Sequence, residues 1–173
     1  MKILIIYNSK TGFSKRYAEW IGEELSCEVK DYKQISEHSL DGVDLLIYGS
    51  RVHAETFYGV KKIKNLARDK KCKLIVFATG ASPADMKDQI AEMWKRSEKD
   101  DTIPHFYMQS GLCYEKMGPL DKLMMKIFVK ILKSKKEKTQ MDIDMTRSVD
   151  KSFDVSSKDF IKPLVEYVRN MDK

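Results

Sequence analysis

The sequence predicts an α/β fold in which helices cover both faces of a parallel β-sheet. Short apolar runs alternate along the chain with segments of helical periodicity, which is the pattern of repeated strand–helix units. Most of these runs are apolar at every position, as expected of strands that are buried on both faces. Turn-forming residues such as Gly, Ser, Thr and Asn follow the runs directly.

Five strands and four helices account for most of the chain. The strands are predicted at residues 3–7, 27–32, 44–48, 73–79 and 105–113. Apolar side chains at helical spacing predict helices around residues 17–25, 60–66, 83–94 and 158–170. Gly49 and Ser50 are expected to end the third strand. Pro163 lies inside the last helical pattern and predicts either a kink or the true start of that helix.

The stretch of residues 115–153 interrupts this rhythm between the fifth strand and the last helix. It begins with a lysine-rich segment and continues with Met141–Met145, where apolar and polar residues alternate as in an edge strand. Elsewhere no linker, repeat or low-complexity segment divides the chain, whose 173 residues suit one domain. We therefore expect a single domain over residues 1–173, with residues 115–153 inserted in it.

The positive charge of the chain is concentrated in this insertion. The formal net charge is +6, from 32 Lys and Arg against 26 Asp and Glu. Residues 116–138 contain eight lysines and two acidic residues, so their local excess equals that of the whole chain. A general nucleic-acid binder is more often basic throughout. The distribution predicts one local anionic partner and no nucleic acid.

Cysteine usage predicts a reducing compartment and no structural metal site. Cys27, Cys72 and Cys113 stand far apart, without the Cys-x-x-Cys or Cys/His spacing of zinc sites. An odd number of widely spaced cysteines is typical of reduced thiols. No apolar run reaches the length of a signal or of a membrane-spanning helix. We therefore expect a cytoplasmic protein.

The loop behind the first strand has the composition of a phosphate-binding loop. It leads into a helix and consists of Ser9, Lys10, Thr11, Gly12, Phe13 and Ser14. Hydroxyl and backbone N–H groups there would donate hydrogen bonds to a phosphate, which the positive end of the helix dipole also favours. An ordinary N-cap is the alternative. Phosphate binding is preferred because two further Gly/Ser/Thr loops follow other strands at the edge where ligands bind.

These three loops resemble those of the flavodoxin family, and the resemblance covers nearly the whole chain. The sequence G-S-R-V-H-A follows the third strand and A-T-G-A-S ends the fourth, whereas the motifs of dinucleotide-binding and nucleotide-hydrolysing folds are absent. The resemblance implies a doubly wound five-stranded sheet in the order 2-1-3-4-5 with noncovalent FMN. It implies that Ser9, Lys10, Thr11, Gly12, Phe13 and Ser14 hold the FMN phosphate. The flavin ring would lie between Ser50, Arg51, Val52, His53 and Ala54 on one side and Thr79, Gly80 and Ala81 on the other.

Two features differ from ordinary flavodoxins, which resemble one another in being strongly acidic. This chain is basic, and its third loop contains no aromatic residue to cover the flavin, although Phe57 and Tyr58 lie just beyond the second. One flavin face is therefore expected to be open to a substrate or partner. Arg51 would meet the N1–O2 edge of the reduced flavin or a substrate carboxylate, and His53 would lie near the ring. For both residues a solvated surface side chain is the alternative.

Residues 119–133 predict an amphipathic helix whose apolar face is unusually wide. At about 100° per residue, its apolar side chains spread over roughly 240°, whereas a helix that rests on its own domain needs little more than about 100°. The polar arc contains Lys122, Lys126, Lys130 and Lys133. These lysines, with Phe128 on the apolar face, suit an anionic membrane surface or a hydrophobic substrate. A homodimer contact and burial in the core are the alternatives.

The insertion gives a second resemblance. Flavodoxin-like chains with Gly-Ser after the third strand and a basic, hydrophobic insert before the last helix are similar to the menaquinone-dependent protoporphyrinogen dehydrogenases. This resemblance implies an FMN-dependent enzyme of heme biosynthesis that passes electrons from protoporphyrinogen IX to a quinone at the inner face of the membrane. It identifies no catalytic residue. A small soluble electron carrier that docks to redox proteins is the alternative, and a flavin-free adaptor is disfavoured by the three loops.

Overall fold

A parallel sheet forms the centre of the computed structural model, which describes residues 1–36, 38–135, 137, 146 and 151–171. Its strands run in the order β2-β1-β3-β5-β6. Their bounds are β1 (Ile3–Tyr7), β2 (Glu28–Asp31), β3 (Leu45–His53), β5 (Lys73–Gly80) and β6 (His105–Gln109). Because β4 (Thr56–Phe57) pairs antiparallel with β3 beside this path, the five parallel strands have the predicted order 2-1-3-4-5. The α/β, doubly wound fold is confirmed.

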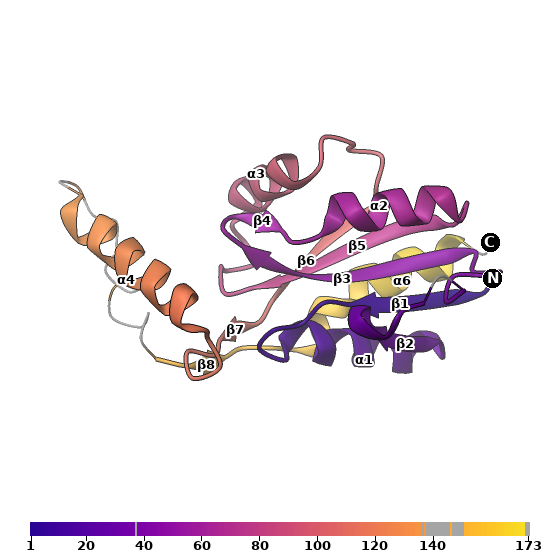
Figure 1. Ribbon diagram of the computed structural model, residues 1–173, viewed down its shortest axis with the longest axis horizontal. Coiled ribbons are helices and arrows are strands. Elements are labelled where there is room, and N and C mark those ends of the chain that lie inside the picture. The colour runs from indigo at the N-terminus through magenta and orange to yellow at the C-terminus, as the bar shows by residue number, and fades with distance from the viewer. Residues whose placement is uncertain (37, 136, 138–145, 147–150, 172–173) are drawn as a thin grey trace.

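Helices cover both faces of the sheet (Figure 1). Their bounds are α1 (Phe13–Leu25), α2 (Val60–Asp69), α3 (Lys87–Ser97) and α6 (Lys162–Met171). Ile5 and Ile47 pack with α1 and α6 in one core, whereas Leu4 and Leu46 pack with α2 and α3 in the other. Successive strand residues point to opposite faces, so an uninterrupted apolar run supplies both cores at once. The continuous runs in the sequence have this physical origin.

The last helix begins where its proline allows. Lys158–Ile161 form a short 3-10 helix, η2, and α6 starts at Lys162 with Pro163 as its second residue. Proline is favourable in the first turn because the N–H it lacks would have no partner inside the helix. Of the two predictions, the true start is therefore correct. A second 3-10 helix, η1 (Tyr32–Gln34), follows β2.

Strand β3 is longer than the sequence predicts. The expected end at Gly49 and Ser50 is wrong, because the strand pairs with β5 as far as Arg51 and with β4 at its last two residues. Gly49 serves close packing instead of a turn. A Cβ atom at Gly49 would lie 2.5 Å from Cζ of Phe77 on the neighbouring strand, so no larger residue fits there without displacing that ring.

The predicted fifth strand is divided at Ser110. Its first part is β6, and its second part is β7 (Gly111–Leu112), which pairs antiparallel with β8 (Phe153–Asp154) in a separate two-stranded sheet. Gly111 permits this pairing, because a Cβ atom there would overlap the backbone carbonyl of Phe153. The β7–β8 pair leads the chain away from the central sheet.

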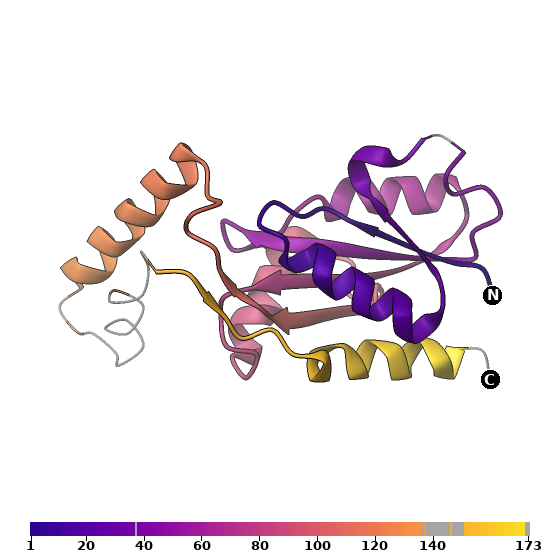
Figure 2. The same cartoon turned by 90° about the horizontal axis from the view of Figure 1, so that it is seen from below.

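Helix α4 (Pro119–Ser134) projects from the body of the protein beyond β7 and β8, as Figures 1 and 2 show. We call α4 and its lead-in residues 113–118 the α4 arm. Six large apolar side chains of α4 are between 39% and 71% exposed: Leu120, Leu123, Met124, Ile127, Phe128 and Ile131. Burial of this face in either core is therefore wrong for the part of the chain that the structure describes. The predicted edge strand Met141–Met145 lies outside the described residues.

The cysteines are three free thiols, Cys27, Cys72 and Cys113. Burial raises the pKa of the Cys27 thiol to about 11 and also raises that of Cys72. Both therefore stay protonated and weakly nucleophilic at neutral pH. Within the residues that the structure describes, no helix has the length and apolar character needed to cross a membrane.

Candidate functional site

Three loops meet at the carboxyl edge of the sheet, where the neighbouring parallel strands β1, β3 and β5 end. Ser14 joins them. Its hydroxyl donates a hydrogen bond to the backbone oxygen of Ser50 at 2.9 Å and lies 2.8 Å from Oγ1 of Thr79. All three side chains are buried. These hydroxyls join the loops to one another, and each already makes a hydrogen bond within the protein.

The first loop has the geometry of an anion site. Gly12 adopts a left-handed φ of +105°, and no atom lies within 4 Å of a Cβ atom placed on it, so the space above the loop is open. Its N–H donates to Oγ of Ser9 at 3.0 Å. Helix α1 has no side-chain cap, so its first N–H groups remain available. The hydroxyl of Thr11 makes no hydrogen bond with any residue that the structure describes. The residues present fit a phosphate group.

Lys10 connects this loop to the α4 arm. Its ammonium group donates to the carboxylate of Asp121 in the first turn of α4. This contact, and to a smaller extent a hydrogen bond from the backbone N–H of Gly118, hold the pKa of Asp121 below its usual value. Gly118 lies directly beside the same ammonium group. A phosphate in the loop would therefore bring a second anion to a lysine that already has one.

Arg51 is held rigidly in the second loop, unlike a solvated surface arginine. Its guanidinium donates to Oδ1 of Asn8 at 2.6 Å and lies 4.0 Å from the centre of the Tyr58 ring. The sequence does not predict Asn8 or Tyr58 as FMN contacts. Asn8 could have been found from its place directly behind β1, and Tyr58 from its aromatic ring close to the second loop.

The remaining residues of the second loop form a β-hairpin. Val52 is partly buried and His53 is exposed, with its ring 6.1 Å from that of Tyr58. Ala54 and Glu55 make the two-residue turn at φ values of 47° and 55°. Left-handed turns of this kind favour Gly, Asn or Asp, so the backbone is strained at the tip of the hairpin.

The third loop is supported by strand β6. The phenol of Tyr107 donates to the backbone oxygen of Ser82 at 2.8 Å, and Oε1 of Gln109 accepts from the N–H of Ala84 at 3.1 Å. Burial raises the pKa of the Tyr107 phenol, so the phenol remains a hydrogen-bond donor. Thr79 is buried beneath the loop, whereas Gly80 and Ala81 are partly exposed. Of the three residues predicted here, these two reach the surface where a ring could lie.

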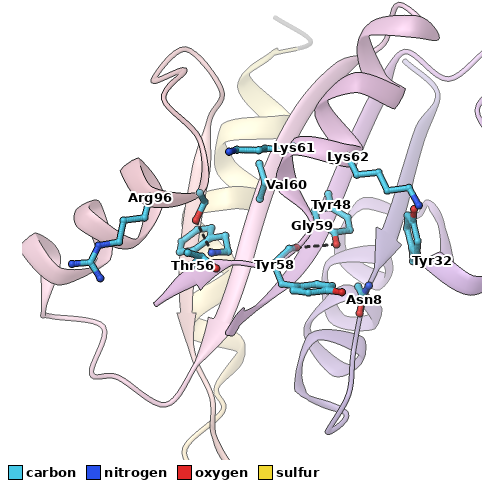
Figure 3. A pocket seen from close by; sticks show the side chains of 12 residues that line it. Asn8, Tyr32, Tyr48, Thr56, Tyr58, Gly59, Val60, Lys61, Lys62 and Arg96 are labelled. Carbon is cyan, nitrogen blue, oxygen red and sulfur yellow. Dashed lines mark hydrogen bonds between the residues drawn. The ribbon is translucent and has the colours of Figure 1, made fainter. Parts of the chain in front are cut away.

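A cleft of about 480 Å³ opens beside these loops (Figure 3). Its lining consists of Asn8, Tyr32, Tyr48, Thr56, Phe57, Tyr58, Gly59, Val60, Lys61, Lys62, Arg96 and Ser97. None of the residues predicted to contact FMN is among them. Tyr58 and Asn8, the two partners of Arg51, therefore stand between the predicted flavin site and this cleft.

The sequence of this chain matches a known protein family. The sequence matches the family described as the flavodoxin domain over residues 4–139, a span that includes all three loops and extends through α4. No curated protein sequence matches the chain.

Solved structures that resemble this one have low sequence identity. A flavodoxin from the domain Archaea is 16% identical, with a TM-score of 0.39, and the alignment covers 86% of this chain and 99% of the other. Oxidised flavodoxin 1 from Bacillus cereus is 15% identical, with a TM-score of 0.41 and coverage of 78% and 99%. The Trp repressor binding protein from Bacillus subtilis is 17% identical, with a TM-score of 0.40 and coverage of 62% and 84%.

At such TM-scores these likenesses carry no argument, so the assignment depends on the family match. That match spans well over half of the chain and contains the open loop around Gly12, the fixed Arg51 and the supported third loop. It identifies a flavoprotein of the electron-transfer type with FMN as the cofactor. The chain belongs to the flavodoxin domain family.

Proposed function

We propose that the protein is an FMN-dependent dehydrogenase that passes electrons from protoporphyrinogen IX to a membrane quinone. The observation that carries the proposal is the α4 arm, which combines an exposed apolar face with lysines and whose first turn contacts the loop that would hold the FMN phosphate. Both substrates are hydrophobic, and the macrocycle also carries carboxylates. An arm that joins apolar side chains to lysines matches that chemistry.

FMN, when bound, would supply two-electron redox chemistry between the macrocycle and the quinone, and three such two-electron, two-proton oxidations convert protoporphyrinogen to the porphyrin while three quinones become quinols. The chain supplies position and charge. Backbone N–H groups of the first loop would bind the phosphate. Arg51, held by Asn8 and Tyr58, would place a fixed cation where negative charge develops on the reduced ring.

We further propose that α4 lies on an anionic bilayer. An interfacial helix presents its apolar residues to the acyl boundary and its lysines to the lipid headgroups. Six exposed apolar side chains and the exposed Lys126, Lys130 and Lys133 meet this description. Lys122 differs, because it is only partly exposed and its ammonium lies 5.1 Å from the ring of Tyr114. It would stabilise the base of the arm.

The reductive half-reaction tests the proposed enzyme. Oxidised, FMN-loaded protein is mixed anaerobically with protoporphyrinogen IX, and the flavin absorbance and porphyrin fluorescence are followed together. The proposal expects flavin bleaching with one fluorescent porphyrin formed for every three flavins reduced, because complete oxidation of the macrocycle removes six electrons. An electron carrier would stay oxidised in this mixture but would be reduced by a flavodoxin reductase, and that outcome would replace the enzyme with the carrier.

A further inference from the structure

The cleft beside Tyr58 is lined by aromatic and cationic side chains, without an acidic one. Of its twelve lining residues four are aromatic, three are cationic and none is acidic. Its volume of about 480 Å³ falls within the roughly 300–1,000 Å³ typical of small-molecule sites. Such a lining favours a ligand that has an apolar ring system and negative charge.

Two of the three cations are available to a ligand. Lys61 makes no hydrogen bond or ion pair with any residue that the structure describes. Lys62 lies with its ammonium 5.3 Å from the centre of the Tyr32 ring, and a hydrogen bond with the phenol of Tyr32 raises the pKa of this lysine. Lys62 therefore stays charged at neutral pH. Arg96, in contrast, is already paired with Glu55.

Lys61 and Lys62 extend toward opposite ends of the cleft. Figure 3 shows Lys61 pointing toward the side on which Arg96 lies, and Lys62 pointing toward Tyr32. Both belong to the first turn of α2, so they share a rigid base while their charges diverge. This placement suits a molecule whose acidic groups are separated, and it is poorly suited to one small anion.

The floor between the lysines is preorganised. The backbone oxygen of Tyr58 accepts hydrogen bonds from the hydroxyls of Tyr48 at 3.1 Å and Ser50 at 2.8 Å. Arg51 packs against the Tyr58 ring, which is still 41% exposed. Gly59 is required here, since a Cβ atom would lie 2.6 Å from Oη of Tyr48. An exposed ring that packs on Arg51, in a residue whose backbone oxygen is held by two hydroxyls, offers a stacking surface at little entropic penalty.

We propose that this cleft binds a largely apolar ring system that carries two carboxylates on separate flexible side chains, and that these carboxylates pair with Lys61 and Lys62. The inference rests on the proposed function, because the tetrapyrrole donor has this chemistry, and it assigns that donor a binding site on the chain. Asn8 lines the cleft and accepts the hydrogen bond of Arg51. A molecule in the cleft would therefore lie next to Arg51, one of the residues predicted to line the flavin ring.

Equilibrium binding of protoporphyrin IX, the oxidised dicarboxylate, tests this site. Binding is followed by porphyrin fluorescence anisotropy, with and without FMN, for the wild type and for Lys61→Glu/Lys62→Glu. The double variant should fold, because the first turn of α2 contains no acidic residue and acidic side chains there favour the helix dipole. The control is Lys73→Glu/Lys99→Glu, with the same charge change on two exposed lysines outside the cleft.

The site predicts that Lys61→Glu/Lys62→Glu binds the porphyrin at least roughly tenfold more weakly, through the loss of two charge-assisted contacts. The control should stay within about twofold of the wild type, and FMN affinity should not change in either protein. Equal porphyrin affinity of the variant and the wild type, or an equal loss in the control, would overturn the inference. A loss only in Lys126→Glu/Lys130→Glu would place the ligand on the α4 arm and would also overturn it.

Failure of the two proposals is distinguishable. Porphyrin binding that depends on Lys61 and Lys62, without any flavin reduction by protoporphyrinogen, keeps the cleft and rejects the enzyme. Flavin reduction that is equally efficient in Lys61→Glu/Lys62→Glu, with an unchanged KM, keeps the enzyme and rejects the cleft.

Discussion

Single hydroxyl groups at the phosphate loop have separable roles. Thr11 is free to bind a ligand, whereas Ser14 bridges Ser50 and Thr79 in the interior. Thr11→Ala should weaken FMN binding by roughly 2–10-fold, since one hydrogen bond contributes about 0.5–1.5 kcal/mol, and should leave the unfolding free energy unchanged. Ser14→Ala should lower that free energy by about 1–3 kcal/mol, because Thr79 loses a buried partner. Fluorescence titration with FMN and urea denaturation measure both, and the reverse pattern would contradict these roles.

The Lys10–Asp121 pair links cofactor affinity to salt. Asp121 places a negative charge beside the loop and occupies the ammonium group of Lys10. Asp121→Asn should therefore bind FMN several-fold more tightly at low ionic strength, and the difference should shrink at high salt as charges are screened. Titrations at two salt concentrations measure the effect. Weaker binding of the variant at low salt would show that the pair organises the loop for the phosphate.

Asp100 gives a pH-dependent contribution to stability. Hydrogen bonds from the Thr102 hydroxyl, from Lys64 and from the Thr102 N–H lower its pKa from 3.8 to about 2. A carboxyl with a depressed pKa stabilises the fold above its unfolded pKa and loses that contribution as pH falls to the folded value. Asp100→Asn should thus be less stable than the wild type at pH 5, with the difference vanishing between about pH 4 and pH 2. A difference independent of pH in urea denaturation would exclude the charge as its cause.

The β3–β4 hairpin stores strain in its turn. Ala54 has a φ of 47°, where glycine is favoured. Ala54→Gly should therefore raise the unfolding free energy by about 0.5–1 kcal/mol, as measured by chemical denaturation. Ala91→Gly, at an exposed position inside α3, should have the opposite sign by about the same amount. Destabilisation of both variants would mean that the turn is not strained.

The α4 arm should bind anionic vesicles. Lys126→Glu/Lys130→Glu should sediment far less with phosphatidylglycerol vesicles than the wild type, because each lysine near such a surface contributes about 1 kcal/mol. The matched control Lys73→Glu/Lys99→Glu should sediment like the wild type, and both variants should retain FMN. Equal sedimentation of the arm variant and the wild type would favour a dimer contact, which analytical ultracentrifugation would then detect.

At the scale of the whole molecule, the fold was largely predictable because both faces of its sheet are buried. Every residue of the run Ile3–Tyr7 is apolar because alternate residues of this strand pack into the two cores on opposite faces of the sheet. The sequence indicates a turn at Gly49, whereas the role of this glycine depends on Phe77, a neighbour in space that belongs to another strand. The sequence pattern shows the periodicity of a helix or strand, but it does not show which residues from other elements pack against it in the folded protein.

The same limit applies to the site. The loops were found because parallel neighbours end at one edge, yet the pairing of Lys10 with Asp121 spans 111 positions and follows only from the three-dimensional path of the chain. Lys61 and Lys62 gave no signal, since lysines at the start of a helix are typical of a solvated face. Only the cleft around Tyr58 distinguishes them from other lysines.

Turnover on membranes tests the complete function most directly. FMN-loaded protein receives protoporphyrinogen IX anaerobically, in the presence of phosphatidylglycerol or phosphatidylcholine vesicles that contain menaquinone, and the porphyrin fluorescence is followed. We expect many turnovers per flavin on the anionic vesicles and much slower turnover on the neutral vesicles. Oxidation that stops at the single two-electron equivalent one flavin can accept, which is one porphyrin for every three flavins, on both kinds of vesicle, would contradict the quinone-linked dehydrogenase.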